Sequence, residues 1–163
     1  MSAEKVVALA KSQVGITEYP EGSGITKYGV DFGDRKSPWD VSFLWWVFLG
    51  AGEGFALFGG AKPTRRDALL RWYTEMGWTA EADSAQPGDI VVLNPYGTDE
   101  SLRYALVVKT LGTGRYETVQ GDCEAGVVSY HIRYANELTA VLRPKYEHSI
   151  DEEMKEVEDD EDY

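Results

Sequence analysis

The chain has 163 residues and a formal net charge of −12, and residues 147–163 alone hold ten acids and one base. This length predicts one folded domain, residues 1–146, followed by an acidic tail, residues 147–163, which is expected to be disordered because it has few apolar residues. No apolar run approaches the roughly 18 residues of a membrane span, and the negative charge argues against a nucleic-acid partner. A single cysteine excludes an internal disulfide, and no cofactor is expected.

Helical patterns dominate the first half of the chain. Residues 2–13 carry an apolar stripe behind a capping serine and predict a helix. Residues 17–33 are rich in glycine and predict a loop. A capping-box pattern at Thr64-Arg65-Arg66-Asp67 predicts another helix that runs to Met76 and ends before a glycine.

The segment Ser37-Pro38-Trp39-Asp40 predicts the start of a central helix. Ser37 is expected to cap this helix, proline suits its first turn, and Asp40 is expected to complete the capping box. The residues that follow are apolar nearly all round as far as Gly50, so we expect the helix to be buried.

From Pro87 onward the pattern becomes that of β-strands, with a tight hairpin expected at Gly112-Thr113-Gly114. Helices followed by strands predict an α+β fold, with N-terminal helices packed on a mostly antiparallel sheet of about five strands. The expected strands span residues 89–93, 104–111, 115–120, 127–132 and 138–142.

Three groups of motifs occur in a specific order. They are Ala8-Leu9-Ala10-Lys11-Ser12-Gln13-Val14-Gly15 with Glu18, then Pro38-Trp39-Asp40-Val41-Ser42-Phe43, and then Gln86-Pro87-Gly88-Asp89 with Tyr104-Ala105-Leu106-Val107-Val108 and Val119-Gln120-Gly121-Asp122. In their order and spacing they resemble the CHAP domain, a papain-like family of cysteine amidases and endopeptidases that cut bacterial peptidoglycan. The resemblance covers about residues 3–146 and implies the papain-like CHAP fold.

The resemblance implies a nucleophilic cysteine at the start of the central helix, a histidine base at the start of a strand, and a polar orienting residue one strand later. This chain has Asp40 at the cysteine position and Tyr104 at the histidine position, while Gln120 and Asp122 occupy the orienting positions. A carboxylate is a weak nucleophile, and tyrosine, with a pKa of about 10, is a poor base near neutrality. We therefore expect no family activity and regard these four positions as a degenerate site.

Other roles for these residues remain open. Cys123 and His131 could form a relocated nucleophile and base, although a semi-buried structural thiol is the simpler interpretation of Cys123. Asp40 and Asp122 could together hold a cation or act as a glycosidase pair, while Asp40 could also serve only the helix terminus.

Trp39, Tyr19 and Cys123 are expected to line the cleft, where an aromatic ring could stack on a ligand. The other helix tryptophans, Trp45 and Trp46, are expected mainly to pack in the core.

Three functions follow from these observations. The first is a catalytically inactive CHAP-like module that binds a peptidoglycan fragment or a protein partner, and the second is an active hydrolase with non-standard chemistry at Cys123 or at a carboxylate-bound metal. The third is an interaction protein, such as a phage-particle component or a regulator of a hydrolase, whose tail docks on a basic surface in a salt-sensitive way. The first residues lack a signal-peptide pattern, so we expect cytoplasmic synthesis, with a phage particle or the cell wall as the destination.

Overall fold

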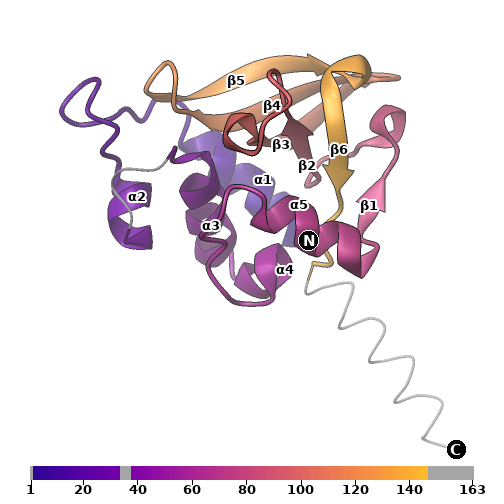
Figure 1. The fold of residues 1–163 in the computed structure, drawn as a ribbon, viewed down its shortest axis with the longest axis horizontal. Helices are drawn as coiled ribbons and strands as arrows, with labels where there is room; N and C mark the ends of the chain where they lie inside the picture. The colour runs from indigo at the N-terminus through magenta and orange to yellow at the C-terminus, as the bar shows by residue number, and fades with distance from the viewer. Residues whose placement is uncertain (1, 34–37, 147–163) are drawn as a thin grey trace, which may run out of the picture.

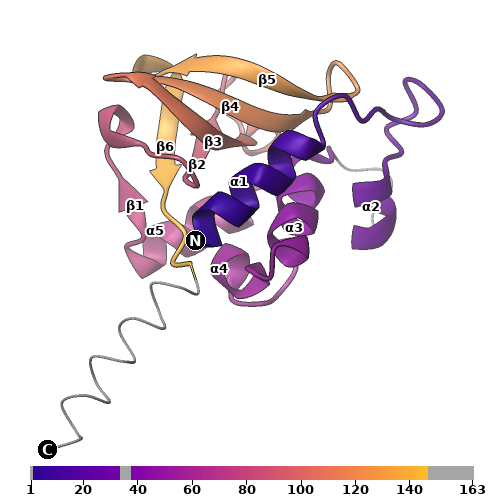
Figure 2. The same cartoon turned by 180° about the vertical axis from the view of Figure 1, so that it is seen from behind.

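The computed structural model describes residues 2–33 and 38–146, which form five α-helices and a six-stranded sheet. The helices lie on one face of the sheet, as Figure 1 shows, and α1 (Ser2–Ser12) crosses beneath the strands in the reverse view of Figure 2. The proposed cap Ser37, His148 and the acidic tail lie outside the described residues.

The sheet is antiparallel throughout, with the strand order β1-β6-β2-β3-β4-β5. Five of its strands confirm those predicted, and the hairpin at residues 112–114 connects β3 to β4. The additional strand, β1, has only two residues, which is too short to show an alternating pattern in the sequence. The strands are β1 (Thr79–Ala80), β2 (Ile90–Leu93), β3 (Arg103–Gly112), β4 (Arg115–Asp122), β5 (Val127–Tyr134) and β6 (Leu138–Leu142).

Two short helices were not predicted. The expected loop over residues 17–33 contains α2 (Lys27–Phe32), where Thr26 accepts a hydrogen bond from the backbone N–H of Gly29 at 3.0 Å. The other is α4 (Gly54–Phe58), which follows the central helix. Neither helix is long enough to display a repeated apolar stripe, and each contains a glycine, which disfavours the helical state. The two helices therefore depend on tertiary packing for their stability.

The central helix, α3 (Asp40–Gly50), is buried as expected, but it begins later than the predicted capping box requires. Asp40 is its first residue and Trp39 precedes it as N-cap with no side-chain cap hydrogen bond, so Asp40 is not the third residue of a capping box. Likewise α5 (Ala68–Met76) begins after Asp67, not after Thr64, and ends at Gly77 as predicted. At both helix starts, tertiary contacts override the local capping pattern.

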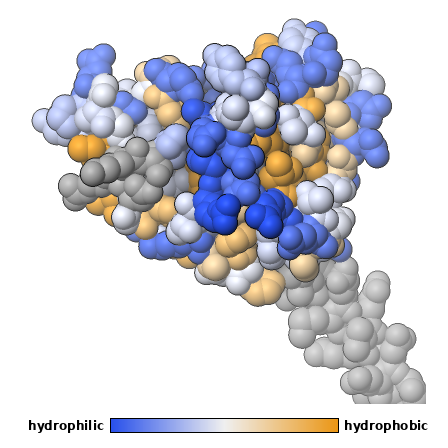
Figure 3. All heavy atoms as spheres, viewed as in Figure 1, coloured by the Kyte–Doolittle hydropathy of each residue, from blue (hydrophilic) through white to orange (hydrophobic). Residues whose placement is uncertain are grey.

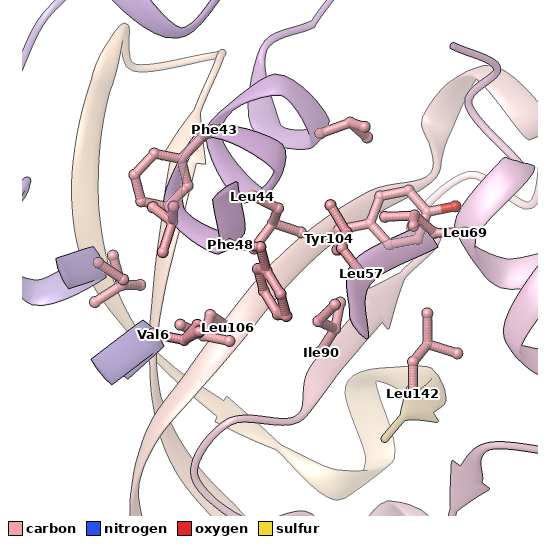
Figure 4. Close-up of a cluster of buried hydrophobic side chains, with 14 of the residues drawn as sticks. Val6, Phe43, Leu44, Phe48, Leu57, Leu69, Ile90, Tyr104, Leu106 and Leu142 are labelled. Carbon is pink, nitrogen blue, oxygen red and sulfur yellow. The ribbon is translucent and has the colours of Figure 1, made fainter. Parts of the chain in front are cut away.

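The main core lies between the helices and the sheet (Figure 4). Phe43 and Phe48 of α3 pack there against Tyr104 and Leu106 of β3. The intervening Ala105 of β3 faces the other side of the sheet, where a smaller core lies. The two faces of the sheet are thus distinct environments, and alternation along a strand assigns each side chain to one of them.

Candidate functional site

The two positions at which the resemblance implies a nucleophile and a base are adjacent. Asp40, at the start of α3, is 1% exposed, and its Oδ2 accepts a hydrogen bond of 2.9 Å from the backbone N–H of Tyr104, at the start of β3. The N-terminus of α3 therefore faces the beginning of β3, the juxtaposition that the resemblance implied.

The partner of Asp40 is Arg66, which the sequence analysis did not assign to the site. Arg66 Nη1 donates to Asp40 Oδ1 at 2.7 Å and Nη2 donates to Asp40 Oδ2 at 2.8 Å, a bidentate pair. Nη2 also donates to the carbonyl of Leu102. Burial lowers the pKa of Arg66, but the hydrogen bonds and charge of Asp40 outweigh this effect and the pKa lies above its ordinary value.

The side chain of Tyr104 contacts Arg66, the partner of Asp40. Its hydroxyl donates to the carbonyl of Arg66 at 2.5 Å, and its ring centre lies 5.8 Å from the guanidinium carbon of Arg66. Burial raises the pKa of Tyr104 to about 12, so the hydroxyl stays protonated at neutral pH. We call Asp40, Arg66 and Tyr104 the Asp40 site.

Little open space remains beside this group. The adjacent hollow encloses about 70 Å³ and is lined in part by Val41, Ser42 and Arg66. Hydrophilic side chains cover the face of the molecule where the segment before α5 approaches the β2–β3 connection (Figure 3). The Asp40 site thus consists of a buried ion pair and a tyrosine with little open space beside them.

Gln120 and Asp122 do not join the Asp40 site. Val119, between Thr118 and Gln120 on β4, packs in the helix-side core, so Gln120 and Asp122 face the opposite side of the sheet. There Gln120 Oε1 accepts from Arg133 Nη2 at 2.8 Å, and Asp122 Oδ2 lies 3.1 Å from His131 Nε2. The expectation that Gln120 and Asp122 form one site with Asp40 and Tyr104 is therefore wrong, because alternation along β4 places Gln120 and Asp122 on the other face of the sheet.

This separation also bears on the cation and glycosidase alternatives. Both oxygens of Asp40 are bound to Arg66, and Asp122 lies on the other face of the sheet. Across residues 2–33 and 38–146, no cluster of three or more His, Cys, Asp or Glu side chains could hold a metal ion. Asp40 and Asp122 thus do not form a paired carboxylate site.

Cys123 and His131 are not paired with each other. His131 uses one ring nitrogen, Nε2, for both Asp122 and the hydroxyl of Ser129, which is 3.0 Å away. A relay needs the two ring nitrogens to contact different partners, so Ser129, His131 and Asp122 do not have the geometry of a catalytic triad.

The thiol of Cys123 instead approaches the start of α3. Burial raises its pKa to about 12, and the charge of Asp40 acts in the same direction, while the backbone N–H groups of Asp40 and Trp39 lower it. Cys123 therefore remains a neutral thiol at neutral pH, which is unsuited to nucleophilic attack.

Trp39 is buried, contrary to the expectation that it lines a cleft. It is 2% exposed, stacks on Tyr28 with ring centres 6.0 Å apart, and donates from Nε1 to Glu18 Oε2 at 2.9 Å. Its ring is therefore not available for stacking on a ligand. Tyr19 is 85% exposed on the neighbouring loop.

An open groove of about 650 Å³ lies beyond Cys123. One wall is formed by residues 17–18 and 21–24 and the other by residues 123–126, and we call it the acidic groove because Glu18, Glu21 and Glu124 line it. A second groove, of about 480 Å³, lies on the opposite face of the sheet and includes Gln120 and Asp122. Asp40 and Tyr104 thus lie in the Asp40 site, whereas Gln120 and Asp122 line the second groove on the other face of the sheet.

No protein-family profile matches the chain, and no curated protein does. Among the described residues, no helix has the length and apolarity to cross a membrane.

Solved structures nevertheless share the fold. The chain superimposes on the structure of Ly7917 with a TM-score of 0.52 and 14% identity, over 87% of this chain and 62% of that one. It superimposes on the P60 domain of antigen MAP1204 from M. avium subspecies paratuberculosis with a TM-score of 0.50 and 18% identity, over 87% of this chain and 93% of that one. These likenesses, together with the helix-and-sheet arrangement above, identify an α+β fold of the papain-like type.

Proposed function

We propose that this chain is a non-catalytic member of the papain-like cell-wall hydrolase group, which acts by binding a peptidoglycan fragment or a protein partner. The observation that carries the proposal is the bidentate Asp40–Arg66 pair at the start of α3. In the papain-like arrangement that position supplies the thiolate, whereas a carboxylate is a weak nucleophile, and both oxygens of Asp40 are engaged by the Arg66 guanidinium.

Two further observations support the proposal. Tyr104 keeps its proton, with a pKa of about 12, and directs its hydroxyl to a backbone carbonyl. The one thiol, Cys123, has a pKa of about 12 and no imidazole hydrogen-bonded to it within the described residues. The similarity to a P60 domain suggests the bacterial cell wall as the source of the ligand.

The direct test measures hydrolysis and binding with the same purified bacterial cell walls. The full chain is expected to leave wall turbidity and released amino groups unchanged, while it sediments with the walls. Cys123→Ala serves as the matched variant and is expected to behave as the parent chain does. Wall lysis by the parent chain that Cys123→Ala abolishes would establish instead an active hydrolase that uses this thiol.

A triple variant tests the correspondence of positions. Asp40→Cys with Tyr104→His alone would leave the Arg66 guanidinium buried without its carboxylate, so Arg66→Ala is included. The introduced thiol would lie at a helix N-terminus beside an imidazole, and both lower the pKa of a thiol. We therefore expect the pH midpoint of its alkylation to lie below about 8.5, the pKa of free cysteine. The measurement uses a Cys123→Ala background, and a midpoint above that of free cysteine would show that positions 40 and 104 do not form such a pair.

A further inference from the structure

Glu18 is a buried carboxylate that lines the acidic groove. It is 6% exposed, and its backbone N–H donates to the carbonyl of Gly126 at 3.0 Å, which ties the two walls together. One carboxylate oxygen, Oε2, accepts from Trp39 Nε1 at 2.9 Å. The other, Oε1, lies beside Gly126, where an added Cβ would be 3.1 Å away.

Among the described residues, Glu18 lacks the arginine partner that two other buried acids, Asp40 and Asp89, have. Asp40 is paired with Arg66 and Asp89 with Arg143, at 2.7 Å and 3.0 Å. Across the described residues, no cation lies within ion-pair distance of Glu18, and Oε1 has no hydrogen-bond donor. Burial of a carboxylate is costly when no opposite charge compensates it, so a carboxylate that is half satisfied and open to a groove is a binding-site candidate.

The groove around Glu18 favours a cation. Among the described residues, its lining includes Glu21 and Glu124 but no lysine, arginine or histidine. Glu124 is paired with Arg103 at 3.0 Å, so Glu18 and Glu21 are the lining acids that have no ion-pair partner within residues 2–33 and 38–146. Because only one oxygen of Glu18 is free, the site suits the point charge of an ammonium group better than the two-pronged guanidinium of arginine.

We propose that the acidic groove binds a primary ammonium group carried by a peptide, with Glu18 Oε1 as its acceptor. This inference rests on the proposed binding function and names the chemistry that the ligand must present. Trp39 positions Glu18 by holding Oε2, and the neutral thiol of Cys123 lies at the end of the groove beside the start of α3.

The test follows the indole N–H resonance of Trp39 by NMR, because that group is hydrogen-bonded to Glu18. The probes are acetyl-Gly-Lys-Gly-amide, the same peptide with an acetylated lysine side chain, and Gly-Gly-Gly-amide with a free amino terminus. We expect a saturable shift with the lysine peptide or with the free amino terminus, and no shift with the acetylated peptide. The comparison between the first and the third probe identifies which kind of amine the groove accepts.

Glu18→Gln removes the charge while its side-chain oxygen can still accept from Trp39 Nε1. We expect this variant to weaken amine binding by at least about tenfold, as loss of a charge-assisted hydrogen bond implies. Glu75→Gln, on α5 and outside the groove, makes the same charge change and is expected to bind as the parent does. If Glu18→Gln does not fold, the comparison of the free and the acetylated lysine peptides on the unmodified chain still tests the proposal.

Three results would overturn the inference. The first is equal binding of the acetylated and the free lysine peptides. The second is that neither the lysine peptide nor the peptide with a free amino terminus shifts the Trp39 resonance. The third is an unchanged affinity for the amine in folded Glu18→Gln. Sedimentation with cell walls whose amines have been acetylated separates the two proposals. Undiminished binding to such walls rejects the ammonium site but leaves the binding function, whereas hydrolysis of untreated walls rejects the non-catalytic function regardless of the amine result.

Discussion

Asp40 and Arg66 each depend on the other for burial. The carboxylate is 1% exposed and accepts three hydrogen bonds, two from the guanidinium and one from the backbone of Tyr104. Such pairs contribute little net stability compared with apolar residues, but removal of one partner leaves an uncompensated charge. The pair therefore fixes how the segment before α5 packs against the start of α3.

We expect Arg66→Met to lower the free energy of unfolding by about 3–5 kcal/mol, because the Asp40 carboxylate then remains buried without its cation. Asp40→Leu combined with Arg66→Met is expected to recover most of this loss. Urea denaturation measures both variants. The control is Arg71→Met, which removes an exposed arginine from its pair with the half-buried Asp67 and is expected to cost under about 1 kcal/mol. A loss as small as that of the control would contradict a buried role for Arg66.

The reactivity of Cys123 provides a second check at the residue scale. With a pKa of about 12, the folded chain holds far less thiolate at pH 8 than free cysteine does. We expect alkylation by iodoacetamide to be slower by about a thousandfold than that of free cysteine, whose pKa is about 8.5, and to accelerate tenfold per pH unit. In urea the rate should rise to that of free cysteine, and a fast reaction in the folded state would show an activated thiol.

At the scale of elements, α3 and β4 approach each other closely at Gly121. An added Cβ there would lie 2.7 Å from two ring carbons of Trp39 and 3.1 Å from Cβ of Phe43. This contact holds Trp39 against the sheet, and Trp39 in turn holds Glu18. A backbone position without a side chain thus controls how the N-terminal end of α3, the Asp40 site and the acidic groove are arranged.

We expect Gly121→Ala to lower the free energy of unfolding by about 1–3 kcal/mol, because the new methyl group overlaps a ring that packing holds in place. Thermal or urea denaturation measures the change. The matched control is Gly54→Ala in α4, where an added Cβ meets the flexible end of Leu49 at 3.3 Å and is expected to have a small effect. Equal and small effects at both positions would contradict a tight α3–β4 contact.

Periodicity along each element accounts for what was and was not predicted at this scale. Five strands had enough apolar residues, in continuous or alternating runs, to be recognised, whereas β1, α2 and α4 are too short to show a pattern. The same alternation, applied to buried Val119, would have assigned Gln120 and Asp122 to the far face of the sheet.

For the whole molecule, the fold is closed by Tyr146, the last described residue. Its ring stacks on Phe48 of α3 with centres 5.9 Å apart, and its hydroxyl donates to the carbonyl of Gly88. Tyr146 thus joins the carboxyl end of the domain to the central helix and to the turn before β2. The body of the chain has its own complete core up to this residue.

We expect a chain truncated after Tyr146 to keep the free energy of unfolding of the full chain, within about 0.5 kcal/mol, because residues 147–163 contain few apolar side chains. A chain truncated after Lys145 also loses the Tyr146 ring and should be less stable by about 3–5 kcal/mol, as for removal of a buried aromatic side chain. Urea denaturation of the three chains makes the comparison. A large loss on removal of residues 147–163 alone would show that the acidic tail contributes to the fold.

The sequence by itself determined the α+β order, the buried central helix and five strands, because these depend on local residue patterns and on the order of the elements. Only the tertiary structure decided that Arg66 fills the site, that Gln120 and Asp122 face away, and that Glu18 is buried beside an open groove. A buried carboxylate is expected to have a cationic partner, but the sequence does not show which residue that partner is. That choice depends on segments that meet only when the chain folds: Arg66 reaches Asp40 across 26 residues, and no arginine or lysine among the described residues reaches Glu18.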